Sequence, residues 1–338
     1  MLTLDNNTLT VSFPEVHPDA TCTISFQRTL RIPDDNRTHH LPPGLGRFPL
    51  NHVDDYASRL PAAWQKRGGV FLPMHEAEAM WIDFDSHYPF AVKVAAGKVN
   101  AVTGKPWSTK LEGFRSGSCD RFVGNGEQDY LSVPQQPWLD GFCVDKGRIR
   151  QFVAMPLGDG YTVEEQLTGE AVHGGLQLIV YPLKPKFYTP SRYSIAPDLC
   201  MSMTCREESA EMGMAPGGLM EQVIHRDEYG VDKFDQSVSA KCFVHLLNSK
   251  QYEWVSGKKP PHAAPTAADY TAHGLPWFAV DDSGAKALLG ASPLKKLDSV
   301  ANLGNKLGKN PLPDNEPLTD KPKVLLVSKP HQVREGEF

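Results

Sequence analysis

The stretch Thr21-Cys-Thr-Ile-Ser-Phe-Gln-Arg-Thr-Leu-Arg-Ile32 decides the fold class, because its apolar residues recur at every second position. On an extended chain one face would carry Cys22, Ile24, Phe26, Leu30 and Ile32. Successive side chains of a β-strand point to opposite faces, so this spacing predicts a long strand, interrupted only at Arg28. The apolar run from Leu9 to Phe13 predicts a partner strand, and Pro33-Asp34-Asp35-Asn36 predicts a turn.

The rest of the chain repeats this style of organisation. It holds 28 prolines and 28 glycines in 338 residues, which favours short elements separated by turns. Alternating segments joined by turns, without strand–helix–strand units, argue against a parallel doubly wound sheet. The predicted fold is mainly β, or α+β with short helices. Its body would be an antiparallel sandwich or barrel-like structure, followed by a C-terminal helical and proline-rich appendage.

The predicted organisation is a β-rich main body over residues 1–280 and a tail over 281–338. A further boundary inside the body, at 104–129 or 183–210, is left open. A helix is predicted after Ser292 from an apolar stripe at helical spacing, made of Leu294, Leu297, Val300, Ala301 and Leu307. A proline-rich linker from Asn310 to Lys323 and a strand from Lys323 to Val327 would follow. A short helix is also expected from Glu207 to Met212.

Composition limits the compartment and the partners. The formal net charge is −5, so no basic excess favours a nucleic acid. No apolar run approaches the ~18 residues that span a bilayer, and the first residues lack the pattern of a signal peptide. No C-x-x-C pair occurs among Cys22, Cys119, Cys143, Cys200, Cys205 and Cys242. We therefore expect a cytoplasmic protein with reduced, mostly buried thiols.

The middle of the chain resembles a family of uncharacterised bacterial and fungal proteins. The strings that carry the resemblance include Gln136-Pro-Trp-Leu-Asp-Gly141, Arg150-Gln-Phe-Val-Ala-Met-Pro-Leu-Gly158, Gly160-Tyr-Thr-Val-Glu164 and Gly274-Leu-Pro-Trp-Phe278. The resemblance covers roughly residues 40 to 280 and implies no activity or catalytic residue. Some members carry the label "integral membrane protein", which the hydropathy of this chain argues against.

The sharpest local pattern for chemistry is Asp83-Phe84-Asp85-Ser86-His87. On a strand, Asp83, Asp85 and His87 would share one face, where two carboxylates and an imidazole could hold a divalent metal or serve acid–base chemistry. The alternative is a solvated strand face. A second acidic cluster, His75, Glu76 and Glu78, is expected on an exposed short helix.

A binding pocket is predicted over residues 136 to 177. Aromatic and polar residues alternate there with short strands and glycine turns, as in small-molecule or glycan pockets. The candidate ligand-binding residues are Trp138, Asp140, Arg150, Tyr161, Glu164 and Glu170. The alternative is an internal network in which Arg150 pairs with Glu164 or Glu170 and positions a long loop.

Two classes of function remain open. The first is a non-catalytic protein that binds a protein partner or assembles with itself through strand edges, as a homo-oligomer for example. The second is a hydrolase or metal-assisted enzyme whose site is built from loops around Asp83, Asp85 and His87, or within 138–170. A divalent metal is the one cofactor that the residues suggest.

Overall fold

The computed structural model describes residues 1–114, 127–190, 211–280, 282, 285–309, 315, 317–318 and 321–327. It is mainly antiparallel β, with 39% strand and 17% helix, which confirms the predicted class. Seventeen strands are hydrogen-bonded into one sheet that does not close into a barrel, and two more strands form a separate pair. Residues 115–126, which include Cys119, and residues 191–210, which include Cys200 and Cys205, lie outside the described residues.

The strands are short and follow one another closely along the chain. Those up to residue 100 are β1 (Leu2–Asp5), β2 (Thr8–Ser12), β3 (Thr21–Thr29), β4 (Thr38–His39), β5 (Gly44–Arg47), β6 (Asn51–His52), β7 (Val70–Met74), β8 (Ala79–Ser86), β9 (Phe90–Ala96) and β10 (Val99–Asn100). The later ones are β11 (Leu131–Val133), β12 (Trp138–Leu139), β13 (Gly141–Asp145), β14 (Arg148–Pro156), β15 (Leu176–Pro182), β16 (Glu211–Glu221), β17 (Ala240–Asn248), β18 (Pro276–Val280) and β19 (Lys323–Val327).

The helices are short and peripheral. They are η1 (Asp54–Arg59), α1 (Ala62–Arg67), α2 (Val163–Thr168), η2 (Pro185–Phe187), α3 (Ser249–Ser256), α4 (Ala267–Ala272), α5 (Ser292–Lys295) and α6 (Val300–Lys306). A helix was expected from Glu207 to Met212, and only its last two residues are described. For these two the prediction is wrong, because Glu211 and Met212 begin β16 and pair with β17.

The first layer of the sheet is an antiparallel run of β1, β2, β3 and β8. The predicted partnership of β2 with β3 is confirmed, with Leu9 opposite Ile24. On its other edge β3 pairs with β8, which places Ile24 opposite Phe84 and Phe26 opposite Ile82. These apolar residues are buried because they lie on the same face of neighbouring strands.

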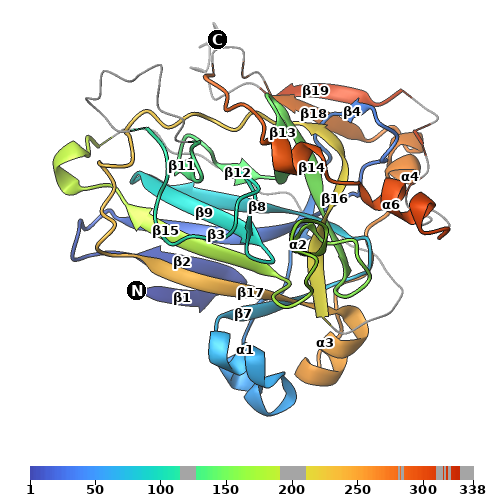
Figure 1. Cartoon of the computed structure of the whole chain (residues 1–338), viewed down its shortest axis with the longest axis horizontal. Helices are drawn as coiled ribbons and strands as arrows, with labels where there is room; N and C mark the ends of the chain where they lie inside the picture. Colours follow the sequence, from blue (N-terminus) through green and yellow to red (C-terminus); the bar gives the residue numbers. More distant parts are fainter. Residues whose placement is uncertain are drawn as a thin grey trace, which may run out of the picture.

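The second layer is built from β11, β9, β15, β17 and β7, in that order. Consecutive strands β8 and β9 belong to different layers, and Figure 1 shows the two layers stacked. One core cluster joins the inner faces of both layers, including Phe26, Ile82, Val94 and Leu178. The layers are also connected through the β14–β16 ribbon, since β14 pairs with β8 and β16 pairs with β17.

The helices α1 and α3 lie beside β7 at one end of the molecule (Figure 1). Aromatic residues pack between them and the second layer. Trp64 of α1 stacks on His245 of β17 at a ring-centroid distance of 4.1 Å, and Phe243 stacks on the same imidazole at 4.3 Å. Burial lowers the pKa of His245 to about 3, so this side chain is an uncharged part of the core.

The tail segment forms two helices where the apolar spacing predicted one. Ser299 caps α6 by accepting a hydrogen bond from the Asn302 amide, and this cap separates α6 from α5. The helix that was predicted after Ser292 begins at Ser292 itself, as α5, and it has no side-chain cap. The segment docks on the sheet: α5 lies against β13 and α6 against β16. The predicted strand at the end of the tail is confirmed as β19, which pairs in parallel with β18.

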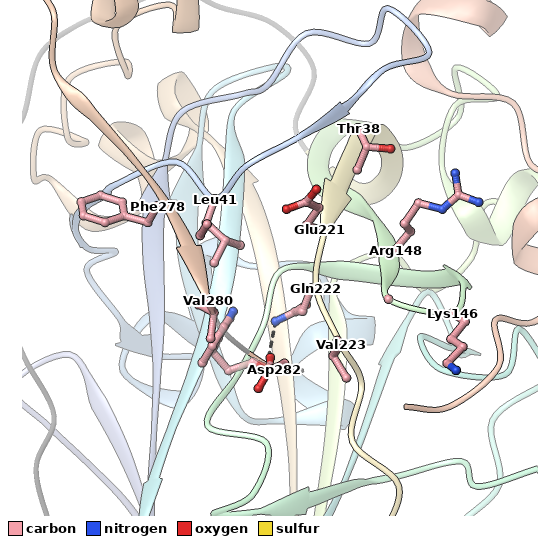
Figure 2. A pocket seen from close by; sticks show the side chains of 13 residues that line it. Thr38, Leu41, Lys146, Arg148, Glu221, Gln222, Val223, Phe278, Val280 and Asp282 are labelled. Carbon is pink, nitrogen blue, oxygen red and sulfur yellow. Dashed lines mark hydrogen bonds between the residues drawn. The ribbon is translucent and has the colours of Figure 1, made fainter. Parts of the chain in front are cut away.

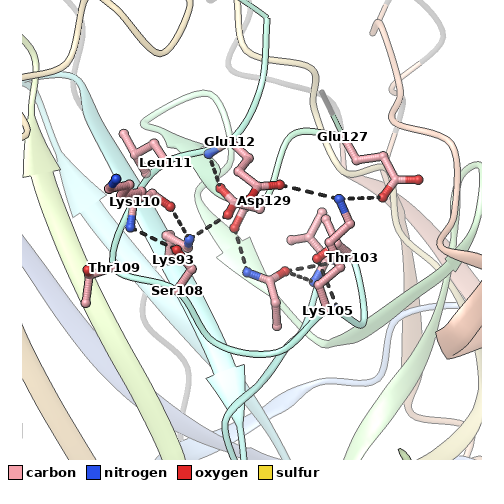
Figure 3. A network of polar contacts seen from close by, with 12 residues as sticks. Lys93, Thr103, Lys105, Ser108, Thr109, Lys110, Leu111, Glu112, Glu127 and Asp129 are labelled. Atoms are coloured by element: carbon pink, nitrogen blue, oxygen red, sulfur yellow. Dashed lines mark hydrogen bonds and ion pairs between the residues drawn. The ribbon is translucent and has the colours of Figure 1, made fainter. Parts of the chain in front are cut away.

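Both flanks of residues 115–126 are fixed to the second layer by a polar network (Figure 3). The ammonium of Lys93 on β9 is buried and donates to the Asp129 carboxylate at 2.5 Å and to the Lys110 carbonyl at 2.6 Å. Asp129 also accepts a hydrogen bond from the Glu112 amide at 2.9 Å. Further out, Lys105 forms ion pairs with Glu112 and Glu127, both at 3.4 Å.

Three cysteines are described, and each is a buried free thiol: Cys22, Cys143 and Cys242. Burial raises the pKa of Cys143 and of Cys242 to about 12, and it raises the pKa of Cys22 as well. The expected burial is therefore confirmed for these three thiols. None of the described helices combines the length and the apolar character needed to cross a bilayer.

Candidate functional site

A groove of about 490 Å³ lies beside the β18 strand. Figure 2 shows it between two walls that come from distant parts of the chain. Its lining residues are Thr38, Leu41, Trp138, Lys146, Gly147, Arg148, Glu221, Gln222, Val223, Phe278, Ala279, Val280 and Asp282. This volume lies within the range of about 300–1,000 Å³ that is typical of small-molecule sites.

The two walls of the groove differ in polarity. One wall is apolar and comes from Leu41, Phe278 and Val280. It is held in place by a bridge in which the backbones of Leu41 and Phe278 exchange two hydrogen bonds of 2.9 Å. The other wall is polar, since the end of β16 contributes Glu221 and the hairpin between β13 and β14 contributes Arg148. These last two residues are opposite each other in the β14–β16 ladder.

Trp138 and Gln222 line the groove and form a hydrogen-bonded unit with the buried Asp140. We call this unit the floor of the groove. The Gln222 amide group donates to the Trp138 carbonyl at 3.2 Å, and its oxygen accepts from the Asp140 backbone N–H at 3.0 Å. The Trp138 indole N–H donates to the Asp140 carboxyl at 2.6 Å. The half-buried Trp138 side chain is thus fixed from below, so the floor is organised before any ligand arrives.

Charged groups of both signs surround the groove. Glu221 lies 3.2 Å from the His40 imidazole, and Asp282 lies 3.5 Å from the His225 imidazole. Arg148 forms an ion pair of 2.6 Å with Asp145, which Lys295 of α5 also contacts at 3.0 Å. These two cations, together with the Lys146 backbone N–H, lower the pKa of Asp145 to about 2. The groove therefore offers hydrogen-bond donors and acceptors along one wall and apolar surface along the other.

Asp140 makes stability depend on pH. Burial raises its pKa to about 7, and the hydrogen bond from Trp138 opposes this only in part. Between about pH 4 and pH 7 the folded protein keeps a proton that the unfolded chain releases. The free energy of unfolding should therefore fall by about 1.4 kcal/mol per pH unit as pH rises through this window, and level off above it.

Asp140→Asn removes this titration and keeps an oxygen that can accept from Trp138. We expect the variant to gain stability relative to the unmodified protein by about 3 kcal/mol between pH 5 and pH 7. Urea unfolding of both proteins at several pH values measures the difference. Stability curves that stay parallel over this range would show that Asp140 ionises normally.

The structure brings together only part of the predicted pocket. Trp138 lines the groove and donates to the buried Asp140 carboxyl, whereas Arg150 is not among the lining residues. The Arg150 guanidinium donates to the Gly217 carbonyl at 3.0 Å and lies 3.5 Å from the buried Asp34 carboxylate. The alternative pairing of Arg150 with Glu164 or Glu170 is therefore wrong.

Tyr161, Glu164 and Glu170 lie around α2, away from the lining of the groove. The buried Glu164 carboxylate accepts hydrogen bonds from the backbone N–H groups of residues 172, 173 and 174, at 2.8–3.0 Å. Tyr161 is buried with its ring 5.3 Å from the Lys309 ammonium, and Glu170 is exposed. Glu164 thus fixes a turn of the main chain.

The predicted metal ligands are spread along the end of β8. Asp83 and Asp85 share the outer face of the strand, where Asp83 accepts a hydrogen bond from Ser25 at 3.3 Å. His87 comes after the last strand residue and is exposed. Within the described parts of the chain, no three histidine, cysteine, aspartate or glutamate side chains are grouped closely enough to hold one metal ion.

The His75 cluster differs from its prediction. His75 and Glu78 are buried in the turn between β7 and β8, and they form no exposed helix. Glu78 binds Arg28 at 2.7 Å, and the His75 ring contacts the Ser249 hydroxyl at 2.8 Å and the Pro261 carbonyl at 2.9 Å. Burial is tolerated because these partners, all distant in sequence, satisfy the polar groups.

Most of the groove was not identified from the sequence. Leu41, Glu221 and Phe278 lie far apart in the sequence, and no pattern of residues connects them. Among the candidate binding residues, only Trp138 lines the groove. Comparison of the chain with protein-family models, with curated proteins and with solved structures finds no match. The resemblance described above therefore stays a prediction, and any functional conclusion depends on the site itself.

Proposed function

We propose that this chain is a non-catalytic binding protein that holds a small amphipathic molecule in the groove. The observation that carries the proposal is the pairing of an apolar wall with a polar wall above a floor already fixed by hydrogen bonds. The apolar side of the ligand would lie against Leu41 and Phe278, and its polar groups would face Glu221 and Arg148.

The mixed charges of the polar wall bear on the chemistry of the ligand. Arg148 is already paired with Asp145, and Glu221 and Asp282 each have a histidine neighbour. A ligand with several hydrogen-bonding groups, a sugar for example, matches such a wall better than one with a single strong charge. The Trp138 side chain in the floor adds an aromatic surface for an apolar face of the ligand.

Filling the groove tests the proposal. Val280→Trp puts a large side chain into the groove from a strand position that suits aromatic residues. In saturation-transfer NMR with a set of amphipathic fragments, we expect fragments that bind the unmodified protein to bind this variant at least about tenfold more weakly.

Leu326→Trp is the matched control, because it adds the same side chain to an exposed position on neighbouring β19. This variant should bind the fragments as the unmodified protein does. The proposal is wrong if no fragment binds, or if both tryptophan variants behave alike.

Two predictions from the sequence remain proposals. The buried free thiols of Cys22, Cys143 and Cys242 support a reducing, cytoplasmic location. Self-association is supported by β19, where Val324, Leu325, Leu326 and Val327 are all exposed. Light scattering at several protein concentrations tests whether a second copy pairs with this strand.

A further inference from the structure

Three cationic side chains gather on one outer face of a chain whose formal net charge is −5. They come from separate elements: Arg67 ends α1, Lys98 lies in the turn between β9 and β10, and Lys241 is near the start of β17. Their charges are close enough to interact, since Arg67 and Lys241 both lower the pKa of Lys98, in addition to the larger effect of its burial. We call these three residues the cationic cluster.

The sheet itself holds the cationic cluster together. Gln177 of β15 lies opposite Phe243 of β17, and its side-chain oxygen accepts from the Lys98 backbone N–H at 2.7 Å. Lys241 precedes Phe243 by two residues, so both project from the same face of β17. The Arg67 guanidinium lies 5.1 Å from the centre of the Phe243 ring. The Arg67 guanidinium therefore lies over Phe243, on the face of β17 from which Lys241 also projects.

A second ring borders the cluster. The Lys98 ammonium lies 5.9 Å from the centre of the half-buried Trp107 ring. Arg67 also contacts the loop at residue 173, donating to the His173 carbonyl at 3.3 Å and to the Val172 carbonyl at 3.1 Å. These contacts fix the position of the guanidinium before any ligand binds.

Neighbouring carboxylates leave the cluster positive. Burial lowers the pKa of His173, and the charges of Arg67 and Lys98 lower it further. The neighbouring carboxylates, Glu164 and Glu170, raise this pKa. The Glu164 carboxylate is buried and already accepts three backbone N–H groups, whereas Glu170 is exposed to solvent. In the described parts of the chain, none of Arg67, Lys98 and Lys241 forms an ion pair with a carboxylate.

The backbone at Lys98 is a separate observation. Lys98 has a φ of +64°, a left-handed conformation that costs a non-glycine residue about 1 kcal/mol. Asparagine occupies three of the other described non-glycine positions with positive φ: Asn6, Asn7 and Asn36. Asparagine or glycine would suit the turn better than lysine does, so the lysine is not explained by turn stability. Strained residues of this kind concentrate at binding sites.

We propose that the cationic cluster binds a phosphate-type oxyanion, either free or carried by an aromatic small molecule. The anion would lie among the Arg67 guanidinium and the two ammonium groups, above Phe243. A planar group attached to the anion could stack on the half-buried Trp107 ring. This site is separate from the groove and does not depend on the function proposed for it.

The test is a calorimetric titration with inorganic phosphate and, in a second arm, with phenyl phosphate. We expect saturable binding that weakens as salt is added, because surface charges are screened. Lys98→Asn keeps the turn, since asparagine tolerates positive φ, and Lys241→Gln changes an exposed side chain. Each variant should bind phosphate about two- to fivefold more weakly than the unmodified protein. The double variant should bind phosphate more weakly than either single variant.

Control variants separate this site from other cations. Lys296→Gln, an exposed lysine on the tail, and Val280→Trp in the groove should both bind phosphate normally. Tighter binding of phenyl phosphate than of phosphate would indicate an aromatic ligand, and equal binding would indicate the free anion. The proposal is overturned if the unmodified protein shows no saturable binding of either probe, or if the double variant binds them equally well.

Discussion

Replacing Lys93 by methionine is expected to lower the free energy of unfolding by about 3–5 kcal/mol. The Lys93 side chain is 1% exposed, and its ammonium forms the ion pair with Asp129 and the hydrogen bond to the Lys110 carbonyl. Methionine has a similar length but carries no charge, so the buried Asp129 carboxylate would lose its partner. The pKa of Asp129 is already raised by burial, which Lys93 opposes. Urea unfolding at neutral pH measures the loss.

Lys105→Met is the control for this prediction, because Lys105 belongs to the same network but its side chain is 44% exposed. Its ion pairs with Glu112 and Glu127 face water, so the same substitution should cost at most about 1 kcal/mol. Adding Asp129→Asn to Lys93→Met should restore part of the stability, because it removes the uncompensated charge. Equal effects of the two methionine variants would show that burial does not control the energetics of this network.

Gly290→Ala is expected to displace the docked tail segment and to cost at least about 3 kcal/mol. A β-carbon at residue 290 would lie 2.1 Å from the Asp145 nitrogen and 2.2 Å from the Val144 carbonyl carbon, which are main-chain atoms of β13. The segment would have to shift and would lose the hydrogen bond from the Ala291 amide to Cys143, together with the burial of Leu294. Hydrogen exchange of residues 285–309 and urea unfolding measure the two effects.

Gly304→Ala is the control in the same segment, and it is expected to increase stability. Its β-carbon would lie 3.6 Å from the Tyr161 hydroxyl, an ordinary contact, in the middle of α6. Alanine favours a helix over glycine by about 1 kcal/mol, so this variant should be slightly more stable. If Gly290→Ala instead leaves amide exchange in the tail unchanged, residue 290 does not lie as close to β13 as the structure places it.

The sequence predicted what depends on neighbours along the chain. The period of two in Thr21–Ile32 predicted a long strand, and β3 forms over Thr21–Thr29 of that stretch, because alternation of faces is a local property of a strand. The capping box at the start of α2 is local in the same way, since Thr162 and Glu165 are three residues apart. Trp138 and Asp140 were found together because they lie two residues apart and contact each other directly.

What depends on distant partners could not be predicted. Arg150 pairs with Asp34, which precedes it by 116 residues, and nothing in the spacing selects Asp34 over Glu164. His75 and Glu78 read as surface residues because Arg28 and Ser249, which satisfy them, lie far away in the chain. The apolar wall of the groove needs the bridge between Leu41 and Phe278, which only the folded chain creates.

The pairing of β7 with β17 has a consequence for synthesis of the chain. Val70 of β7 lies beside Val244 of β17, and β17 also completes the edge of β15. Until residues 240–248 have left the ribosome, one edge of β15 and one edge of β7 have no strand to bond with. Open edges of this kind promote aggregation. We therefore expect a nascent chain of this protein to be prone to aggregation until β17 is in place.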